Sequence, residues 1–349
     1  MLMTTLVFLK VHGIQSIESQ DGIQFYADSS TYHEIANGEH SVDLDETGLV
    51  SVAGNFFGPI AILNILNNNY YFVATLNILI FYFSITQISK LYKISPLKLL
   101  TVLLLNPITI SSLLSINKEI ISLLFLFSLL KYINCKKLSL LPMVFITALM
   151  VRWQLVIFAI IIIFYYSNIN VLFKKPWQYG LALLLTCSVA YTLTGNTLAA
   201  VRLNFELSAE NHDGSGIWIS LIELQNQGYY FLVFPLKAAQ LLFGLSFNVS
   251  TISSSNNFYN DVIQVLGSLS TLTLFIFLLI NKTLKKNSLT FISILYLIFF
   301  CLSPIYTPRY LYPIYIIWSI LACASHKKNH KEHFRKHERR NNIAADTVR

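Results

Sequence analysis

The feature that most constrains the fold is a series of ten apolar runs separated by polar segments, several of them rich in lysine. The runs lie near residues 1–17, 70–89, 97–115, 118–133, 138–152, 153–168, 177–194, 262–281, 288–304 and 309–324. Because an upright helix needs about 20 apolar residues to cross a bilayer, several runs are short. Short helices are tolerated where they pack around a water-filled cavity. We therefore predict an all-α polytopic membrane protein with about ten transmembrane helices.

The composition agrees with lipid as the surrounding solvent. Of the 349 residues, 54% are hydrophobic, 14% are aromatic and only 12% are charged. An average soluble domain carries about twice this share of charge. The four cysteines show no CxxC or metal-ligand spacing, so we expect neither a disulfide framework nor a zinc site. A nucleic-acid partner is not expected either.

The distribution of charge predicts the orientation, because Lys and Arg are enriched in cytoplasmic loops. Lysines cluster within 90–98, 131–137, 174–175 and 282–286, and eight Lys and Arg residues lie in the tail. Ten crossings put every cluster on the cytoplasmic side, together with both termini. Of the 17 acids, eight lie between Glu18 and Glu46, in a predicted outer loop. We expect a membrane domain over 1–325 and a basic, disordered cytoplasmic tail over 326–349.

Two outer segments are long, at about 18–69 and 195–261. Each contains an apolar piece. The piece at 54–66 is too broken to predict a crossing, whereas the piece at 229–244 has both flanks outside and is predicted to lie in the interface or to re-enter. Loops of this length in a compact protein are usually functional.

Five basic residues on the predicted outer side depart from the charge rule, namely Lys118, Arg152, Arg202, Lys237 and Arg309. A charge at membrane depth costs a few kcal/mol and therefore normally faces a cavity or a partner. Arginine is suited to bidentate contact with phosphate oxygens. We expect Lys118, Arg152, Arg202 and Arg309 to bind the phosphate of a lipid.

Two structural alternatives stay open for these cations. Lys118 can pair with Glu119 or Glu206 instead of an external anion. Arg202 can extend to lipid headgroups, with its aliphatic stem along apolar surface.

The segment 26–38 reads Y-A-D-S-S-T-Y-H-E-I-A-N-G and predicts a short helix after the first crossing. Asp28 or Ser29 is then a candidate N-cap. The functional alternative is a general base, because a carboxylate beside an apolar wall can take a proton from an attacking hydroxyl. On that interpretation Asp28 is catalytic and Glu34 assists.

This acid, followed one helical turn later by Tyr32, resembles the C-type (GT-C) integral-membrane glycosyltransferases. Two further stretches carry the resemblance, L-N-P-I-T-I-S-S-L-L-S-I-N-K-E-I at 105–120 and S-P-I-Y-T-P-R-Y-L-Y-P at 303–313. The resemblance covers the layout of most of the chain but only these three stretches in residues. Many family members have adjacent Asp and Glu in the first loop, whereas Ser29 follows Asp28 here.

The resemblance implies transfer of a sugar from a polyprenyl-phosphate-linked donor to an acceptor hydroxyl on a saccharide or lipid. The reaction would occur at the non-cytoplasmic face of a bacterial inner membrane. Asp28 would be the base, and Lys118, Arg152 and Arg309 would hold the phosphate.

Four residues are candidate substrate contacts, namely Tyr32, His212, Tyr306 and Tyr310. A plain loop turn is the favoured explanation for H-D-G-S-G at 212–216, and an interfacial aromatic belt explains the tyrosines near Arg309 about as well as substrate contact does. No cofactor is required. A divalent metal stays an option, since Asp28, His33, Glu34 and Asp213 could supply ligands.

Two other functions compete with the transferase. An O-antigen or exopolysaccharide polymerase uses similar lipid-linked donors. A lipid-linked oligosaccharide flippase or transporter would bind the phosphate without chemistry. Against transport, no symmetric halves are evident, and the ionisable groups gather on one predicted face rather than through the midplane.

Overall fold

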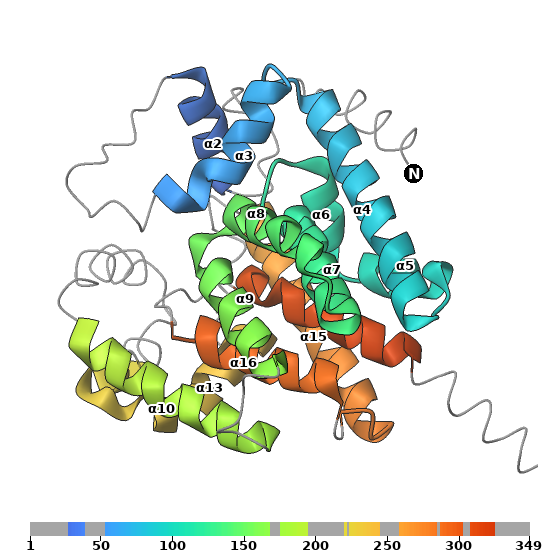
Figure 1. The fold of residues 1–349 in the computed structure, drawn as a ribbon. Helices are drawn as coiled ribbons and strands as arrows, with labels where there is room; N and C mark the ends of the chain where they lie inside the picture. Colours follow the sequence, from blue (N-terminus) through green and yellow to red (C-terminus); the bar gives the residue numbers. More distant parts are fainter. Residues whose placement is uncertain are drawn as a thin grey trace, which may run out of the picture.

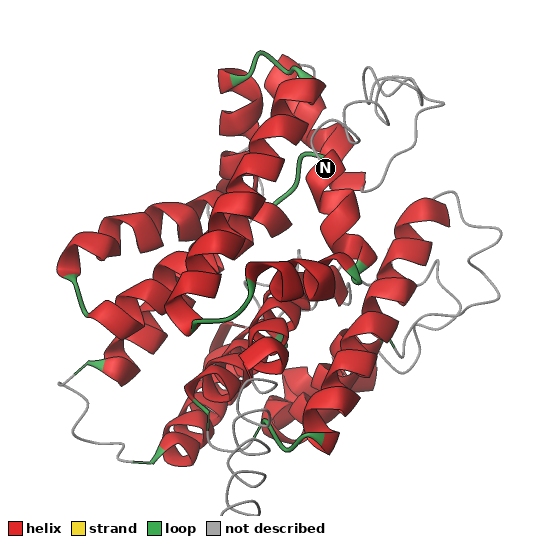
Figure 2. Ribbon diagram, turned by 90° about the vertical axis from the view of Figure 1, so that its right-hand side faces the viewer, coloured by secondary structure: helices red, strands yellow, loops and turns green. Residues whose placement is uncertain are grey.

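The computed structural model describes residues 27–38, 53–167, 175–194, 220–221, 223–244, 258–284, 287–302 and 308–324. Every element in these ranges is a helix, and Figures 1 and 2 show only helices and connecting loops there. The all-α prediction is confirmed for this part of the chain. The predicted first crossing, most of the two outer loops and the basic tail lie outside the described residues.

The longer helices follow one another along the chain. They are α2 (Ala27–Asn37), α3 (Ala53–Ile65), α4 (Tyr70–Tyr92), α5 (Pro96–Leu104), α6 (Pro107–Leu114), α7 (Glu119–Cys135), α8 (Leu141–Val151), α9 (Trp153–Tyr166), α10 (Pro176–Thr194), α13 (Tyr230–Phe243), α15 (Phe258–Ile280) and α16 (Ser288–Phe300). A final helix covers 312–324. Short helical turns are η1 (Leu138–Leu140), η2 (Gln225–Tyr229) and η3 (Pro308–Leu311).

By length and composition, two of the described helices can cross a membrane, over Tyr71–Tyr92 in α4 and Val262–Ile280 in α15. The bent pair of α5 and α6 would add a third crossing. Other apolar helices, among them α9 and α16, have only 10–17 residues. The structure is therefore compatible with a helical membrane protein, but the ten predicted crossings are not confirmed.

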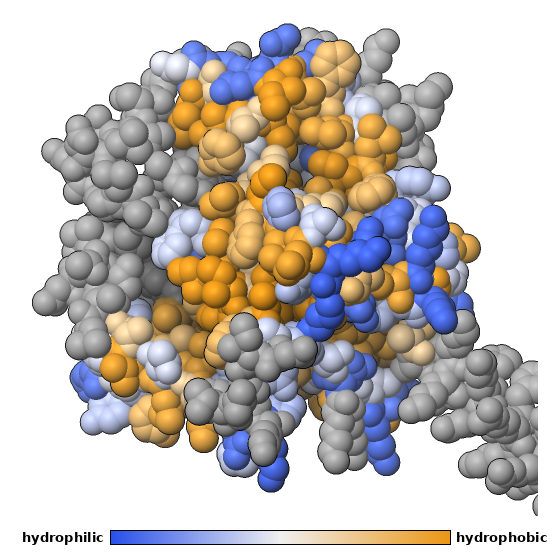
Figure 3. Space-filling model, viewed as in Figure 1, coloured by the Kyte–Doolittle hydropathy of each residue, from blue (hydrophilic) through white to orange (hydrophobic). Residues whose placement is uncertain are grey.

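The surface supports a lipid environment. Figure 3 shows hydrophobic residues over much of the described surface on one face, with hydrophilic residues at the top and bottom and in a patch right of the centre. Large apolar side chains point outward on several helices, including Leu79 and Tyr82 on α4 and Ile146 on α8. Contiguous exposed apolar surface of this kind is rare on soluble monomers and marks contact with a membrane or a partner.

The core lies around α7 and the final helix (Figure 1). The helix α7 packs against α4 and α8, and α8 packs in turn against α3 and α9. Both α7 and the final helix are buried on nearly all sides, as expected for helices that are apolar all round. In the rest of the described structure, α10 packs against α13 and α16, and α15 packs against α6 and α13.

The apolar run 97–115 was predicted as one helix, and this prediction is wrong. The chain breaks between α5 and α6, whose axes differ by 92°. Pro107 cannot continue the hydrogen-bond ladder of α5, and the residue before a proline avoids helical backbone angles. Asn106 accordingly has φ −92° and ψ 118°, and its side-chain oxygen accepts a hydrogen bond from the Ile108 N–H at 3.0 Å. The break is thus a capped start of α6.

The two outer apolar pieces form helices. The piece near 54–66 folds as α3 despite Pro59 in its interior, and it packs against α8. The piece at 229–244 forms α13, which ends at Gly244 in the left-handed conformation at φ 63°. The predicted boundary near 152 is confirmed, because α8 ends at Val151 and α9 begins at Trp153.

Candidate functional site

Three of the predicted phosphate ligands meet at one small cavity. Lys118, Arg152 and Arg309 line it together with Glu119 and Tyr310. They come from the turn between α6 and α7, the break between α8 and α9, and the η3 turn. All three cations are buried, with 6%, 9% and 7% of their surface exposed, respectively. Buried cations are costly unless they face a partner, so the cavity is the strongest candidate site.

Lys118 is held by a tightly bonded turn over residues 115–118. The Asn77 amide on α4 donates to the Ser115 carbonyl at 2.9 Å, and the Ser29 hydroxyl on α2 donates to the Ile116 carbonyl at 2.9 Å. Asn117 accepts from the Glu119 N–H at 3.1 Å and so satisfies the start of α7. Asn77 lies seven residues after the start of α4, so the turn that it contacts is about 10 Å along the helix axis from the start of α4.

Arg152 is the single residue between α8 and α9. Its backbone is extended, at φ −166° and ψ 140°, while its N–H still donates to Ala148 O at 2.8 Å. The end of α8 is also approached closely by α3. A Cβ built on Gly58 would lie 1.8 Å from the Met150 carbonyl oxygen, so only glycine allows this contact. The packing of α3 therefore fixes the backbone two residues before Arg152.

Tyr310 joins two of the cations. The Arg152 guanidinium carbon lies 3.5 Å from the Tyr310 ring centroid, and that of Arg309 lies 5.5 Å from it. Both distances are within the range of cation–π attraction. The Tyr296 hydroxyl on α16 donates to the Tyr310 carbonyl at 3.1 Å and fixes this part of η3. The ring thus holds both guanidinium groups at one wall of the cavity.

The helix α2 lies beside the same cavity. The Lys118 ammonium is 5.4 Å from the Tyr32 ring centroid, and Tyr32 is fully buried. His33 is also buried, whereas Glu34 is half-buried. Of the predicted substrate contacts, Tyr32 and Tyr310 are therefore near the cation cavity.

The prediction that Asp28 or Ser29 is the N-cap of α2 is wrong. The helix begins at Ala27, so Asp28 lies in its first turn rather than before it. Ser29 donates its hydroxyl to the Ile116 carbonyl rather than capping its own helix. The side chain of Asp28 lies outside the described residues, and its role as a base stays a prediction.

The three stretches that carry the GT-C resemblance lie next to one another where they are described. The first, in α2, contacts the second through Ser29 and Tyr32. The second contacts the third through Thr109, whose hydroxyl is 2.7 Å from the Tyr312 hydroxyl. Segments more than 200 residues apart in the chain are thus joined by a hydrogen bond.

The charges at the cavity are unequal. Among the described residues that line it, three cations face one acid, Glu119, which is itself buried. Glu119 also keeps open the alternative in which Lys118 has an internal partner, because both residues line the same cavity. The gathering of three cations at one cavity favours an anionic ligand.

The cavity is small. Its volume is about 20 Å³, room for about one water molecule. A phosphate group therefore enters only after a side chain or helix at the rim moves aside. Tyr310 and α2 with Tyr32 are the elements that cover the cations.

Lys237 does not join this cavity. It is fully buried in α13, and its ammonium donates to the side-chain oxygen of Gln225. The Gln225 amide donates in turn to the Leu302 carbonyl at 2.7 Å. Lys237 thus belongs to a separate polar network between α13, η2 and the end of α16.

Arg202, His212 and Tyr306 lie outside the described residues, so their predicted roles stay untested. Among the described residues, no group of three His, Cys, Asp or Glu side chains is close enough to hold a metal ion. All four cysteines fall within the described part and are free thiols.

The sequence reasoning missed Tyr296 and Gln225. Tyr296 lies in an unbroken apolar run and looks like an ordinary core residue. Gln225 is one of several polar residues in a turn. No local pattern identifies either residue, because their partners lie 12 to 77 residues away.

Comparison of the chain with protein-family models, curated proteins and solved structures found no match.

Proposed function

We propose that the protein binds the phosphate of a lipid-linked sugar at the cation cavity and transfers the sugar to an acceptor hydroxyl. The observation that carries the proposal is the convergence of Lys118, Arg152 and Arg309, from three distant parts of the chain, on one buried cavity. Buried cations with one acid among them are suited to an anion that carries several oxygens. A lipid-linked phosphate reaches such a site from the membrane.

The chemistry follows from where charge develops. The acceptor oxygen attacks the anomeric carbon of the sugar, and the bond from that carbon to the phosphate oxygen breaks. The phosphate leaves with the electron pair, so its negative charge rises in the transition state. Arg152 and Arg309, held on the Tyr310 ring, are preorganised to stabilise this charge. Removing one such group typically lowers the rate about 10²–10³-fold.

The acceptor proton needs a base. We assign this role to Asp28, with Glu34 as a helper, because α2 docks on the turn that carries Lys118. A carboxylate on α2 can then take the proton as the acceptor oxygen attacks. Closing of the small cavity after the donor has bound would exclude water from the reaction.

The orientation is part of the proposal. With ten crossings, the lysine clusters and both termini lie in the cytoplasm and the cation cavity lies toward the other side of an inner membrane. Cysteines introduced at Ser41 and Ser288 of a cysteine-free variant test this. Position 41 should react with an impermeant thiol reagent from outside and position 288 only from the cytoplasm. The reverse pattern overturns the orientation.

The function is tested in proteoliposomes that contain a polyprenyl-phosphate-linked sugar and an acceptor. We expect Arg152→Gln and Arg309→Gln to lose transfer about 10²-fold or more, and Asp28→Asn to lose it while still binding the donor. Lys175→Gln, at an exposed lysine outside the cavity, is the control and should retain activity. Near-normal turnover by Asp28→Asn refutes the role of Asp28 as the base. If the wild type binds the donor but transfers no sugar, the transferase function is refuted in favour of a transporter.

A further inference from the structure

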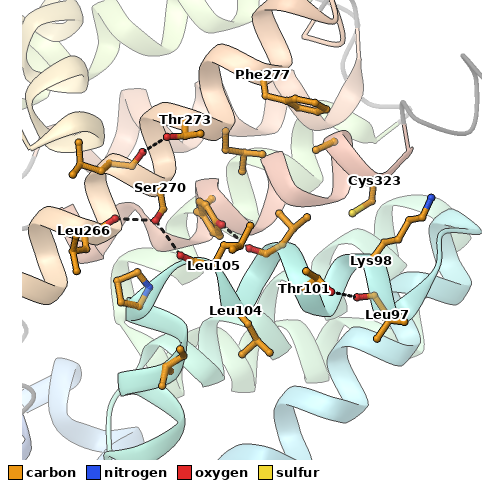
Figure 4. Close-up of a pocket in the computed structure, with 17 residues that line it drawn as sticks. Leu97, Lys98, Thr101, Leu104, Leu105, Leu266, Ser270, Thr273, Phe277 and Cys323 are labelled. Atoms are coloured by element: carbon orange, nitrogen blue, oxygen red, sulfur yellow. Dashed lines mark hydrogen bonds between the residues drawn. The ribbon is translucent and has the colours of Figure 1, made fainter.

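A second, much larger cavity lies between α5, α6, α15 and the final helix. It is a groove of about 940 Å³, and it shares no lining residue with the cation cavity. On α15 one stripe lines it, formed by Leu266, Leu269, Ser270, Thr273, Leu274 and Phe277. These positions recur at three- and four-residue spacing and therefore lie on one face of the helix. The groove runs along that face (Figure 4).

The length of the groove matches one leaflet. From Leu266 to Phe277 the chain advances eleven residues, about 16 Å along the α15 axis. Half of a hydrocarbon core of about 30 Å is about 15 Å. The groove is thus as long as one leaflet is deep, which is the length of a single acyl chain.

The polar groups in the groove are already bonded within the protein. The Thr101 hydroxyl donates to the Leu97 carbonyl at 2.9 Å, and the Thr273 hydroxyl donates to the Leu269 carbonyl at 2.8 Å. Ser270 contacts the carbonyl oxygens of both Leu266 and Leu105. Because these hydroxyls are occupied, hydrocarbon can cover them without leaving an unsatisfied donor. Figure 4 shows the bonds along the groove.

One end of the groove carries a positive charge. Lys98, which is exposed, is the only charged residue among the described residues that line the groove. It lies at the end with Cys323 and Phe277, whereas Leu266 lies at the other end (Figure 4). Shortly after Phe277, α15 ends at Ile280 and is followed by Lys282. The lysines at positions 98 and 282 mark this end of the groove as the one at the membrane surface.

We propose that the groove binds one anionic phospholipid of the leaflet at the Lys98 end, with an acyl chain along α15 and the phosphate on Lys98. Three observations select this occupant: a groove one leaflet long, a lining whose hydroxyls are satisfied, and a single cation at the surface end. A polyprenyl chain is several times longer than the groove. The proposal concerns a different ligand from the transfer reaction and does not depend on it.

Photo-crosslinking tests the proposal on the full chain in phosphatidylcholine vesicles. The probes are phosphatidylglycerol and phosphatidylcholine that each carry a diazirine on one acyl chain, and the labelled peptides are identified by mass spectrometry. We expect labelling to concentrate on α5, α15 and the final helix, with phosphatidylglycerol preferred about fivefold, as for one lysine beside an anionic headgroup.

Two variants and two controls separate headgroup from chain binding. Lys98→Gln should abolish the preference for phosphatidylglycerol, whereas Lys90→Gln, at an exposed lysine outside the groove, should retain it. Thr273→Trp fills the groove and should remove the labelling of α5, whereas Leu79→Trp on the exposed face of α4 should not. Each of these results supports the proposal.

Three outcomes overturn the proposal. The first is even labelling of all lipid-facing helices. The second is an unchanged headgroup preference in Lys98→Gln. The third is a crosslink in the groove to a second copy of the chain, because a protein segment would then be the occupant.

Discussion

Replacing Gly58 by alanine tests how the cation cavity is held in place. The new Cβ would lie 1.8 Å from the Met150 carbonyl oxygen and 2.6 Å from its carbonyl carbon. Both are backbone atoms, so no side-chain rotation relieves the overlap. An ordinary contact begins near 3.4 Å, so α3 and the end of α8 must separate by about 1.6 Å. Overpacking of this kind costs about 1–3 kcal/mol and sometimes more.

The displacement falls two residues before Arg152, so it should affect the site as well as stability. We expect a Tm lower by several degrees, since 1 kcal/mol shifts Tm by about 2–4 °C in a domain of 150–250 residues. We also expect weaker binding of a polyprenyl phosphate. The assay is thermal unfolding in detergent, with lipid binding measured on the same sample.

The matched control is Gly180→Ala in α10. The Cβ there would meet only side-chain atoms of Ile298 and Phe291, each at 3.9 Å. Because alanine is the better helix former, this variant should be neutral or more stable by up to about 1 kcal/mol. Equal stability of Gly58→Ala and Gly180→Ala would refute the close approach of α3 and α8.

Three further predictions follow from single contacts. Lys237→Met and Gln225→Leu should each destabilise the protein, because each single change leaves a buried polar partner. The double variant should therefore lose less stability than the two single losses added together. A double-mutant cycle in thermal unfolding that shows no coupling would contradict this. Tyr310→Phe should keep the cation–π contacts and bind lipid phosphate normally, whereas Tyr310→Leu should lose about 0.5–2 kcal/mol of stability; equal Tm values for the two would be inconsistent with the contact. Ser29→Ala removes the bond to the Ile116 carbonyl and should cost about 1 kcal/mol, measured as increased proteolysis of α2; unchanged proteolysis would argue against this docking.

The parts that the sequence could predict are those where a residue breaks a strong rule. Arg152 interrupts a long apolar run, and the structure ends one helix and begins another there. Lys118 and Arg309 depart from the charge bias of their predicted side, and the structure brings both to the cavity of Arg152. Charges that are costly at membrane depth gather where they share partners, so the departures indicated a common site.

The parts of the structure that the sequence could not predict depend on contacts between distant segments. The Asn106–Pro107 pair does signal a turn, but the continuous apolar run around it outweighed that signal. The position of Lys237 depends on Gln225 and on the end of α16, which no local pattern connects. The charge rule alone grouped Lys237 with the other cations, whereas packing put it in a separate network.

The proposed role of the buried cations is to bind the phosphate of a lipid. The most direct measurement is the affinity of a polyprenyl phosphate for the full chain in lipid nanodiscs, compared among wild type, Arg152→Gln, Arg309→Gln and the control Lys175→Gln. A charge-assisted hydrogen bond contributes about 1.5–3 kcal/mol, so each arginine variant should bind about 10- to 100-fold more weakly while the control binds as the wild type does. Equal affinities for all four folded proteins would contradict the claim.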